Sequence, residues 1–243
     1  MRQRLNTAIR LGVLMLLGLA PRAGAQGEVD RLAALAPDLS RGVLQRALTA
    51  LECSPDPRQR DEPILAVIDY SLPSTAKRLW VFDRAEPKLL YRLLVAHGVG
   101  TGENRARMFS NRSGSLQSSL GLFRTAEAYQ GRNGYSLRLD GLDPGVNDRA
   151  RERTIVIHGA WYVSPEFAAD HGRLGRSWGC PALERRVAAT VIDAIKDGAA
   201  LFISGDDGRW LAHESRRSCP LPRDQIAGST SSVSASSTAA SRP

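Results

Sequence analysis

A cysteine and a histidine of this chain stand in glycine-containing segments that could perform nucleophilic chemistry. Cys180 lies between Gly179 and Pro181, and His158 is followed directly by Gly159. A cysteine attacks as its thiolate, so it needs a nearby base or a positive environment that lowers its pKa. A glycine and a proline on either side constrain the backbone, expose the sulfur and leave N–H groups free for a developing oxyanion. In this interpretation Cys180 is the nucleophile, His158 the base, and Gly179 and Gly159 supply backbone groups.

The residues alone leave two other interpretations open. Cys180 could be a small buried apolar residue, and His158 a hydrogen-bonded core histidine. His158, His171 and Cys180 could also converge on zinc, but their spacing fits no standard zinc pattern and supplies no fourth ligand. We therefore expect no metal and no cofactor.

The first 25 residues have the composition of a secretory signal. A basic start without acidic residues is followed by the apolar run 11–20 and by the small residues 23–25. The run is too short to cross a bilayer, so we expect residues 1–25 to be removed and Gln26 to begin the mature protein. An uncleaved N-terminal anchor is the alternative. Cleavage predicts a periplasmic or secreted protein without stable membrane insertion.

The charge of the chain does not indicate a nucleic-acid partner. The formal net charge is +8, and removal of four arginines with the predicted signal lowers it to +4. No stretch interleaves aromatic and basic residues as a single-strand groove does. Nearly all the basic residues are arginines, whose planar fork suits a substrate rich in carboxylates.

Hydrophobic spacing divides the rest of the chain into a helical part and a β-rich part. Apolar residues recur every three or four positions in residues 26–59, which predicts helices there. Residues 60–212 carry short branched and aromatic runs separated by turn residues, which predicts strands. Residues 213–243 form a C-terminal segment that we expect to be disordered from about residue 226. The expected strands are 64–70, 78–83, 88–96, 154–158 and 200–204, and the expected helix after the cysteine is 183–197.

The order His158-Gly159, a long loop, then Ser177-x-Gly179-Cys180 resembles the catalytic motif of the L,D-transpeptidases. The wider sequence is similar to the branch known as the murein L,D-transpeptidase catalytic domain. The resemblance covers about residues 60–205. Its matching segments are residues 96–98, 109–111, 118–121, 129–131, 136–142, 147–150, 153–159 and 175–182.

The resemblance implies a fold and a reaction. The fold would be mainly β, a β-sandwich with a helix after the catalytic cysteine and an N-terminal helical segment. Cys180 would attack stem tetrapeptides of peptidoglycan, expel D-alanine and hold the acyl group as a thioester for transfer to an amine. His158 would be the base, Ser177 would line the site, and Gly159 would supply backbone to the histidine. Water as acceptor would make the protein an L,D-carboxypeptidase or hydrolase, and loss of turnover would leave a peptidoglycan-binding protein.

Two positions depart from the family's usual pattern. Trp178 stands where a histidine usually precedes the motif glycine, and Ala182 where an arginine usually follows the cysteine. The base role therefore rests on His158, and substrate carboxylates must be met elsewhere. The candidates for substrate binding are Arg176, Arg124, Arg138 and Trp178.

The three cysteines cannot all pair within one molecule. Cys53 and Cys219 flank the catalytic region, so we predict that they form a disulfide and leave Cys180 free. The alternative is that both stay unpaired.

Overall fold

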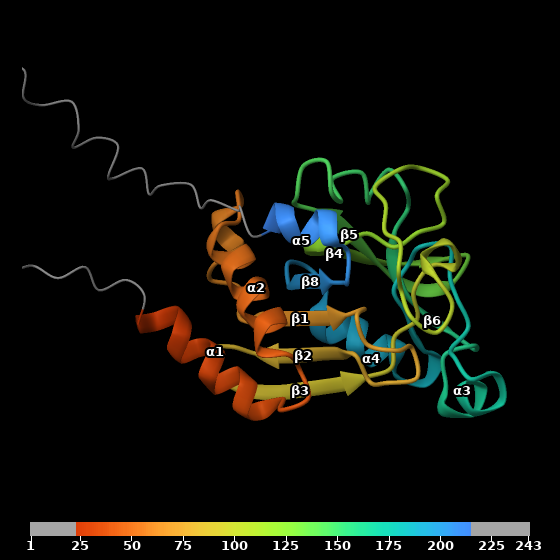
Figure 1. Cartoon of the computed structure of the whole chain (residues 1–243), viewed down its shortest axis with the longest axis horizontal. Helices are drawn as coiled ribbons and strands as arrows, with labels where there is room; N and C mark the ends of the chain where they lie inside the picture. The colour runs from red at the N-terminus through yellow and green to blue at the C-terminus, as the bar shows by residue number, and fades with distance from the viewer. Residues whose placement is uncertain (1–22, 215–243) are drawn as a thin grey trace, which may run out of the picture.

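The computed structural model of the protein describes residues 23–214 (Figure 1). The helices are α1 (Ala23–Leu35), α2 (Arg41–Glu52), α3 (Pro165–His171), α4 (Arg185–Ile195) and α5 (Gly208–Glu214), with the short 3-10 turns η1 (Pro57–Gln59) and η2 (Val99–Thr101). The strands are β1 (Ile64–Asp69), β2 (Leu79–Asp83), β3 (Lys88–Leu93), β4 (Gly121–Gly131), β5 (Gly134–Gly141), β6 (Val156–Ala160), β7 (Ala182–Glu184) and β8 (Ala200–Ser204).

The strands form one sheet in the order β3-β2-β1-β8-β4-β5-β6-β7. Neighbouring strands are antiparallel except for the parallel pairs β1–β8 and β6–β7. The predicted mainly β fold is therefore confirmed, with its strands joined in a continuous sheet. The helix after the cysteine and the N-terminal helical segment are both present.

The centre of the sheet is covered on both faces. All five residues of β8 and nearly all of β1 are buried, as their apolar runs require. On one side α2 contacts β1, β4 and β8, and α1 contacts β3. Figure 1 shows α1 and α2 on the left of the sheet and α3 at the lower right, beyond β6.

α4 packs on the part of the sheet that carries the expected base. Its buried face, which includes Val191 and Ile195, lies against β5, β6 and β7. A Cβ at Gly159 would lie 3.0 Å from the Cβ of Ala188, which is too close without a shift. Glycine next to His158 thus lets α4 approach β6.

The sheet differs from the sequence prediction in several places. The strand expected at 88–96 ends at residue 93, and residues 182–184 form β7 where the helix 183–197 is expected to begin. The strand expected at 154–158 begins two residues later, because Thr154 has φ 55° and cannot continue a strand. The long strands β4 and β5 were not predicted. Their sequences mix buried apolar residues with arginine, glutamate and glycine, so they lack a clear apolar run.

Several predictions concern residues outside the described range. These are the expected signal sequence up to residue 22, Cys219 and the tail that is expected to be disordered. Within residues 23–214, no helix is long and apolar enough to cross a membrane.

Candidate active site

The pairing of β6 with β7 brings the two motif segments together. His158 is the register partner of Ala182, and the two strands run parallel. Moving two residues back along each strand therefore places Cys180 beside Val156. The backbone N–H of Val156 donates to Cys180 Sγ at 3.5 Å. His158 and Cys180 consequently line the same cavity, whose volume is about 550 Å³.

The expected exposure of the sulfur is wrong, because Cys180 is almost completely buried beneath this cavity, with 9% of the residue's surface exposed. Its thiol donates to the carbonyl oxygen of Thr154 at 3.8 Å. Burial raises the pKa of the Cys180 thiol, and the Val156 N–H and the charge of Arg153 act in the opposite direction. The resting group is therefore a thiol, and a base must remove its proton when it attacks.

His158 is held in the tautomer that a base requires. Its ring Nδ1–H donates to the carbonyl oxygen of Gly159 at 3.2 Å, so Nε2 carries the lone pair. Burial lowers the pKa of His158 below its ordinary value of 6.5, and the Gly159 hydrogen bond offsets only part of this. A neutral imidazole that lines the same cavity as a thiol can accept a proton and does not form a resting ion pair.

Ser177 shapes the turn that presents the cysteine. Its hydroxyl donates to the carbonyl of Cys180 at 2.6 Å and accepts from the N–H of Gly179 at 3.1 Å. The Gly179 N–H, expected as an oxyanion donor, is therefore already used. No hydrogen bond joins the Cys180 N–H to another of residues 23–214, so this group is the one available.

The turn that contains Cys180 depends on two glycines, Gly179 in the turn itself and Gly98 in the segment packed against it. Gly179 has φ 123°, and a Cβ there would lie 2.9 Å from the Gln117 carbonyl oxygen. A Cβ at Gly98 would lie 2.4 Å from the Leu116 carbonyl oxygen and 2.8 Å from the Gly179 Cα. Any side chain at either position would push the cysteine turn away from the loop that contains Gln117.

Trp178 and Arg176 both lie at the cavity, as expected for substrate contacts. Trp178 is 74% exposed. The Arg176 guanidinium donates to Glu103 at 2.6 Å and to the Gly102 carbonyl at 3.2 Å. Its charge is thus partly compensated before a substrate arrives.

Arg138 reaches the cavity only through another side chain. It pairs with Glu127 at 2.9 Å, and its guanidinium lies over the Tyr129 ring, 4.2 Å from the centroid. Tyr129 lines the cavity and Arg138 does not. The role that the structure offers Arg138 is to hold Tyr129 in place.

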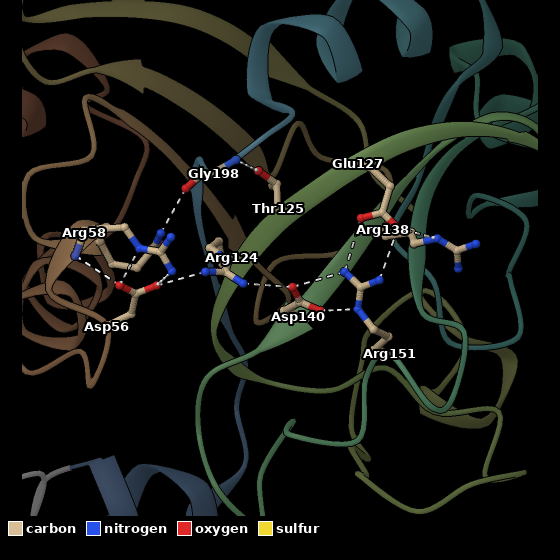
Figure 2. A network of polar contacts seen from close by, with 10 residues as sticks. Asp56, Arg58, Arg124, Thr125, Glu127, Arg138, Asp140, Arg151 and Gly198 are labelled. Atoms are coloured by element: carbon tan, nitrogen blue, oxygen red, sulfur yellow. Dashed lines mark hydrogen bonds and ion pairs between the residues drawn. The ribbon is translucent and has the colours of Figure 1, made fainter.

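Arg124 is not brought to the cavity. It lies between Asp56 and Asp140, with ion pairs of 3.0 and 3.3 Å, in a chain of alternating charges (Figure 2). It lines a separate hollow together with Arg151. A direct contact between Arg124 and a substrate bound at the cysteine is therefore not supported by this geometry.

The sequence did not single out Arg153, which holds the loop over the cavity. Its guanidinium donates to four groups of residues 110–119, namely the Ser110 and Gln117 carbonyls, both at 2.6 Å, and the Ser119 and Ser115 hydroxyls, at 2.6 and 3.1 Å. The positive charge also favours the Cys180 thiolate. The only sequence signal is an arginine directly before a buried strand, inside a segment that matches the family.

Replacing Arg153 with methionine is expected to raise the pKa of Cys180 further, because a nearby positive charge is lost. The measurement is the rate of alkylation by iodoacetamide as a function of pH. Arg149→Met is the matched control, since Arg149 is exposed and pairs with Glu152. A profile for Arg153→Met that superimposes on that of the wild type would rule out the electrostatic role.

A buried arginine and a buried histidine support the turn that precedes Cys180. Arg78 is fully buried and donates to His97 Nδ1 at 2.7 Å, while His97 Nε2–H donates to the Gly102 carbonyl at 3.2 Å. The carbonyl of His97 accepts from the Ser177 N–H at 3.0 Å. Burial, and next the charge of Arg78, lower the pKa of His97 to about 4. His97 is therefore a neutral structural residue.

His97 is expected to make the folded protein less stable in mild acid. Above pH 6.5 His97 is neutral in both the folded and the unfolded chain. As the pH falls from 6.5 to about 4, the unfolded chain binds a proton that folded His97 does not. The free energy of unfolding should fall by about 3 kcal/mol over that window. Urea unfolding across it tests this, and His97→Gln should show a smaller fall. An equal fall in both proteins would contradict it.

The candidate zinc ligand His171 and the cysteines have the following surroundings. His171 lies on α3, where its ring stacks on Phe167, and residues 23–214 hold no cluster of three potential metal ligands. Cys180 is a free thiol, and Cys53 is disulfide-bonded. The expected partner, Cys219, lies outside the described residues, so the pairing stays a prediction.

Comparison with known proteins decides the family. A family model described as the L,D-transpeptidase catalytic domain matches residues 35–204 of the 243. The chain belongs to this family. The match includes α2 and both segments that carry His158 and Cys180. No curated protein matches the chain.

Solved structures that are similar to this chain include three bacterial proteins. An L,D-transpeptidase from Mycobacterium smegmatis is 15% identical, with 59% of each chain covered and a TM-score of 0.36. L,D-transpeptidase 1 of Mycobacterium tuberculosis is 15% identical over 59% of this chain and 63% of its own, with a TM-score of 0.34. The helical cell shape determining protein Pgp2 of Campylobacter jejuni is 13% identical over 85% of this chain and 61% of its own, with a TM-score of 0.38. The chain thus spans about three fifths of the length of these proteins.

Proposed function

We propose that this protein is an exported cysteine L,D-transpeptidase that acts on the stem peptides of peptidoglycan. The observation that carries the proposal is one cavity containing a buried thiol and a neutral histidine with its Nε2 free. Family membership supports the substrate class. The predicted signal supports a periplasmic or secreted location, where such a substrate is found.

The first half of the reaction forms a thioester. The Cys180 thiol turns from the Thr154 carbonyl and gives its proton to His158 Nε2 as the sulfur attacks the acyl carbon of a tetrapeptide. The C–N bond to the terminal D-alanine breaks, and the histidine returns the proton to the leaving amine. The Cys180 N–H binds the oxyanion of the tetrahedral intermediate.

The second half of the reaction transfers the acyl group. The side-chain amine of a second stem attacks the thioester carbon and loses a proton to His158, and the Cys180 thiolate leaves and is reprotonated. The product is a cross-link between two stems. Water in place of the amine would give a shortened stem.

Arginines at the cavity supply charge for the carboxylates of a stem. Arg132 lies exposed at the cavity, and Arg176 lies deeper and is held by Glu103. A carboxylate can therefore bind Arg132 directly, whereas binding to Arg176 competes with Glu103.

The test is product analysis with mature protein beginning at Gln26 and with its Cys180→Ala variant. Each is incubated with tetrapeptide muropeptides, and the products are identified by mass spectrometry. Wild type should give dimers that have lost one D-alanine, and Cys180→Ala should give none. Tripeptide monomers alone would identify water as the acceptor. Unchanged substrate with the wild type would contradict an enzymatic role and favour peptidoglycan binding without turnover.

A further inference from the structure

The long connection between β6 and β7 carries a set of aromatic rings that the proposed chemistry does not use. Trp161 packs edge-to-face on both Tyr162 and Phe167, with centroid distances of 5.9 and 5.6 Å. Phe167 in turn stacks on His171 at 4.0 Å with an interplanar angle of 6°. We call the three rings of Trp161, Phe167 and His171 the aromatic surface.

The aromatic surface is held rigidly although it lies in a connection. The Ser164 hydroxyl accepts from the Phe167 N–H at 3.1 Å and so begins α3. The Gly175 N–H donates to the Tyr162 carbonyl at 2.9 Å, which ties the two ends of the connection together. A Cβ at Gly175 would lie 2.4 Å from the Tyr162 side chain, so glycine permits this contact. Rings fixed in this way lose little entropy when a ligand binds.

Two rings of the aromatic surface, Trp161 and His171, are exposed to solvent, and Phe167 is half-buried. Exposed apolar patches rimmed by polar residues are typical of binding surfaces, and Trp161 is 67% exposed. Tyr162, which Trp161 contacts, lines the cavity that contains Cys180, and so does the exposed Trp178. The aromatic surface therefore adjoins the cavity on the Tyr162 side.

The chemistry of the aromatic surface suits a sugar. A pyranose ring presents a flat face of C–H groups, which packs on an aromatic face, and a rim of hydroxyl and amide groups. Glu166 and Asp170 are exposed on the same short helix and can accept from that rim. These two carboxylates disfavour an anionic membrane surface as the occupant.

We infer that the aromatic surface binds the sugar rings of the glycan strand while the attached stem peptide lies in the cavity. This inference rests on the proposed function, because a stem in the cavity carries its attached glycan to the surface around the cavity. The long connection between His158 and Cys180 would then contribute to substrate selection rather than to the chemical step.

The test compares two substrates that differ only in the sugar. KM is measured for a disaccharide-tetrapeptide and for the free tetrapeptide, with wild type, Trp161→Ala and Trp161→Phe. The KM for the disaccharide-tetrapeptide divided by the KM for the free tetrapeptide should rise about three- to tenfold in Trp161→Ala. This ratio should rise much less in Trp161→Phe, which keeps an aromatic ring. Leu90→Ala is the control, because Leu90 is exposed on β3 and should leave the ratio unchanged.

A second measurement separates this inference from the proposed function. Tryptophan fluorescence is titrated with a β-1,4-linked N-acetylglucosamine tetramer, which needs no turnover. Saturable quenching that Trp161→Ala removes would support the aromatic surface even if neither substrate were converted. An unchanged KM ratio, an equal rise for both substrates, or binding to anionic vesicles in place of the tetramer would overturn the inference.

Discussion

Replacing His158 with glutamine is expected to lower kcat for acyl transfer by about 10²–10⁴-fold, the range that a positioned base supplies. Glutamine can occupy the space of the ring and can donate to the Gly159 carbonyl, but it cannot accept the thiol proton. Burial keeps Cys180 as a thiol, so loss of the base should act directly on the step in which the thioester forms. The measurement is kcat with tetrapeptide muropeptides at pH 7.

The pH dependence of kcat/KM in the wild type should also report on His158 as the base. Because burial lowers the pKa of His158, the imidazole is neutral at pH 7 and is protonated only below 6.5. The value of kcat/KM should therefore fall on the acid side of 6.5, and this acid limb should be missing in His158→Gln.

His213→Gln is the control, since His213 is exposed on α5 and does not line the cavity. It should retain the rate and the pH profile of the wild type with the same muropeptides. A rate for His158→Gln within a few-fold of the wild type would mean that another group removes the proton.

Replacing Arg78 with methionine is expected to lower the free energy of unfolding by about 3–5 kcal/mol, because several buried acceptors lose their donor at once. The guanidinium donates to the Val95 carbonyl through two nitrogens, at 3.1 and 2.9 Å, to the Leu72 carbonyl at 2.8 Å and to His97. Methionine fills the space but leaves these groups unpaired in the core. Urea unfolding followed by circular dichroism measures the loss.

Arg58→Met is the matched control for this prediction. The Arg58 side chain is 76% exposed, and its main partner is the neighbouring Asp56. An exposed ion pair contributes little to stability, so the control should unfold close to the wild type. Equal losses in the two variants would show that Arg78 does not organise the buried cluster.

The sequence predicted the parts of the site that depend on local chemistry. Glycine and proline around Cys180, and glycine after His158, mark close backbone approaches that the structure contains. The fold class followed from the apolar runs and from the family motif, because runs such as 64–70 and 200–204 are buried on both faces.

The sequence did not predict the groups that act over long separations. Arg153 contacts residues more than 30 positions away, and Arg78 reaches His97 across the core. Neither arginine stands in a pattern that distinguishes it from a surface charge. For the same reason the sequence alone suggests Arg124 as a substrate contact, whereas its partners Asp56 and Asp140 hold it away from the cavity.

The role of Cys180 as nucleophile is tested by the intact mass of the protein after brief incubation with a tetrapeptide muropeptide and acid quenching. We expect a covalent adduct equal to the substrate minus D-alanine, carried by the peptide that contains Cys180. His158→Gln should accumulate this adduct far more slowly. An adduct on another residue, or turnover that persists in Cys180→Ala, would contradict Cys180 as the nucleophile.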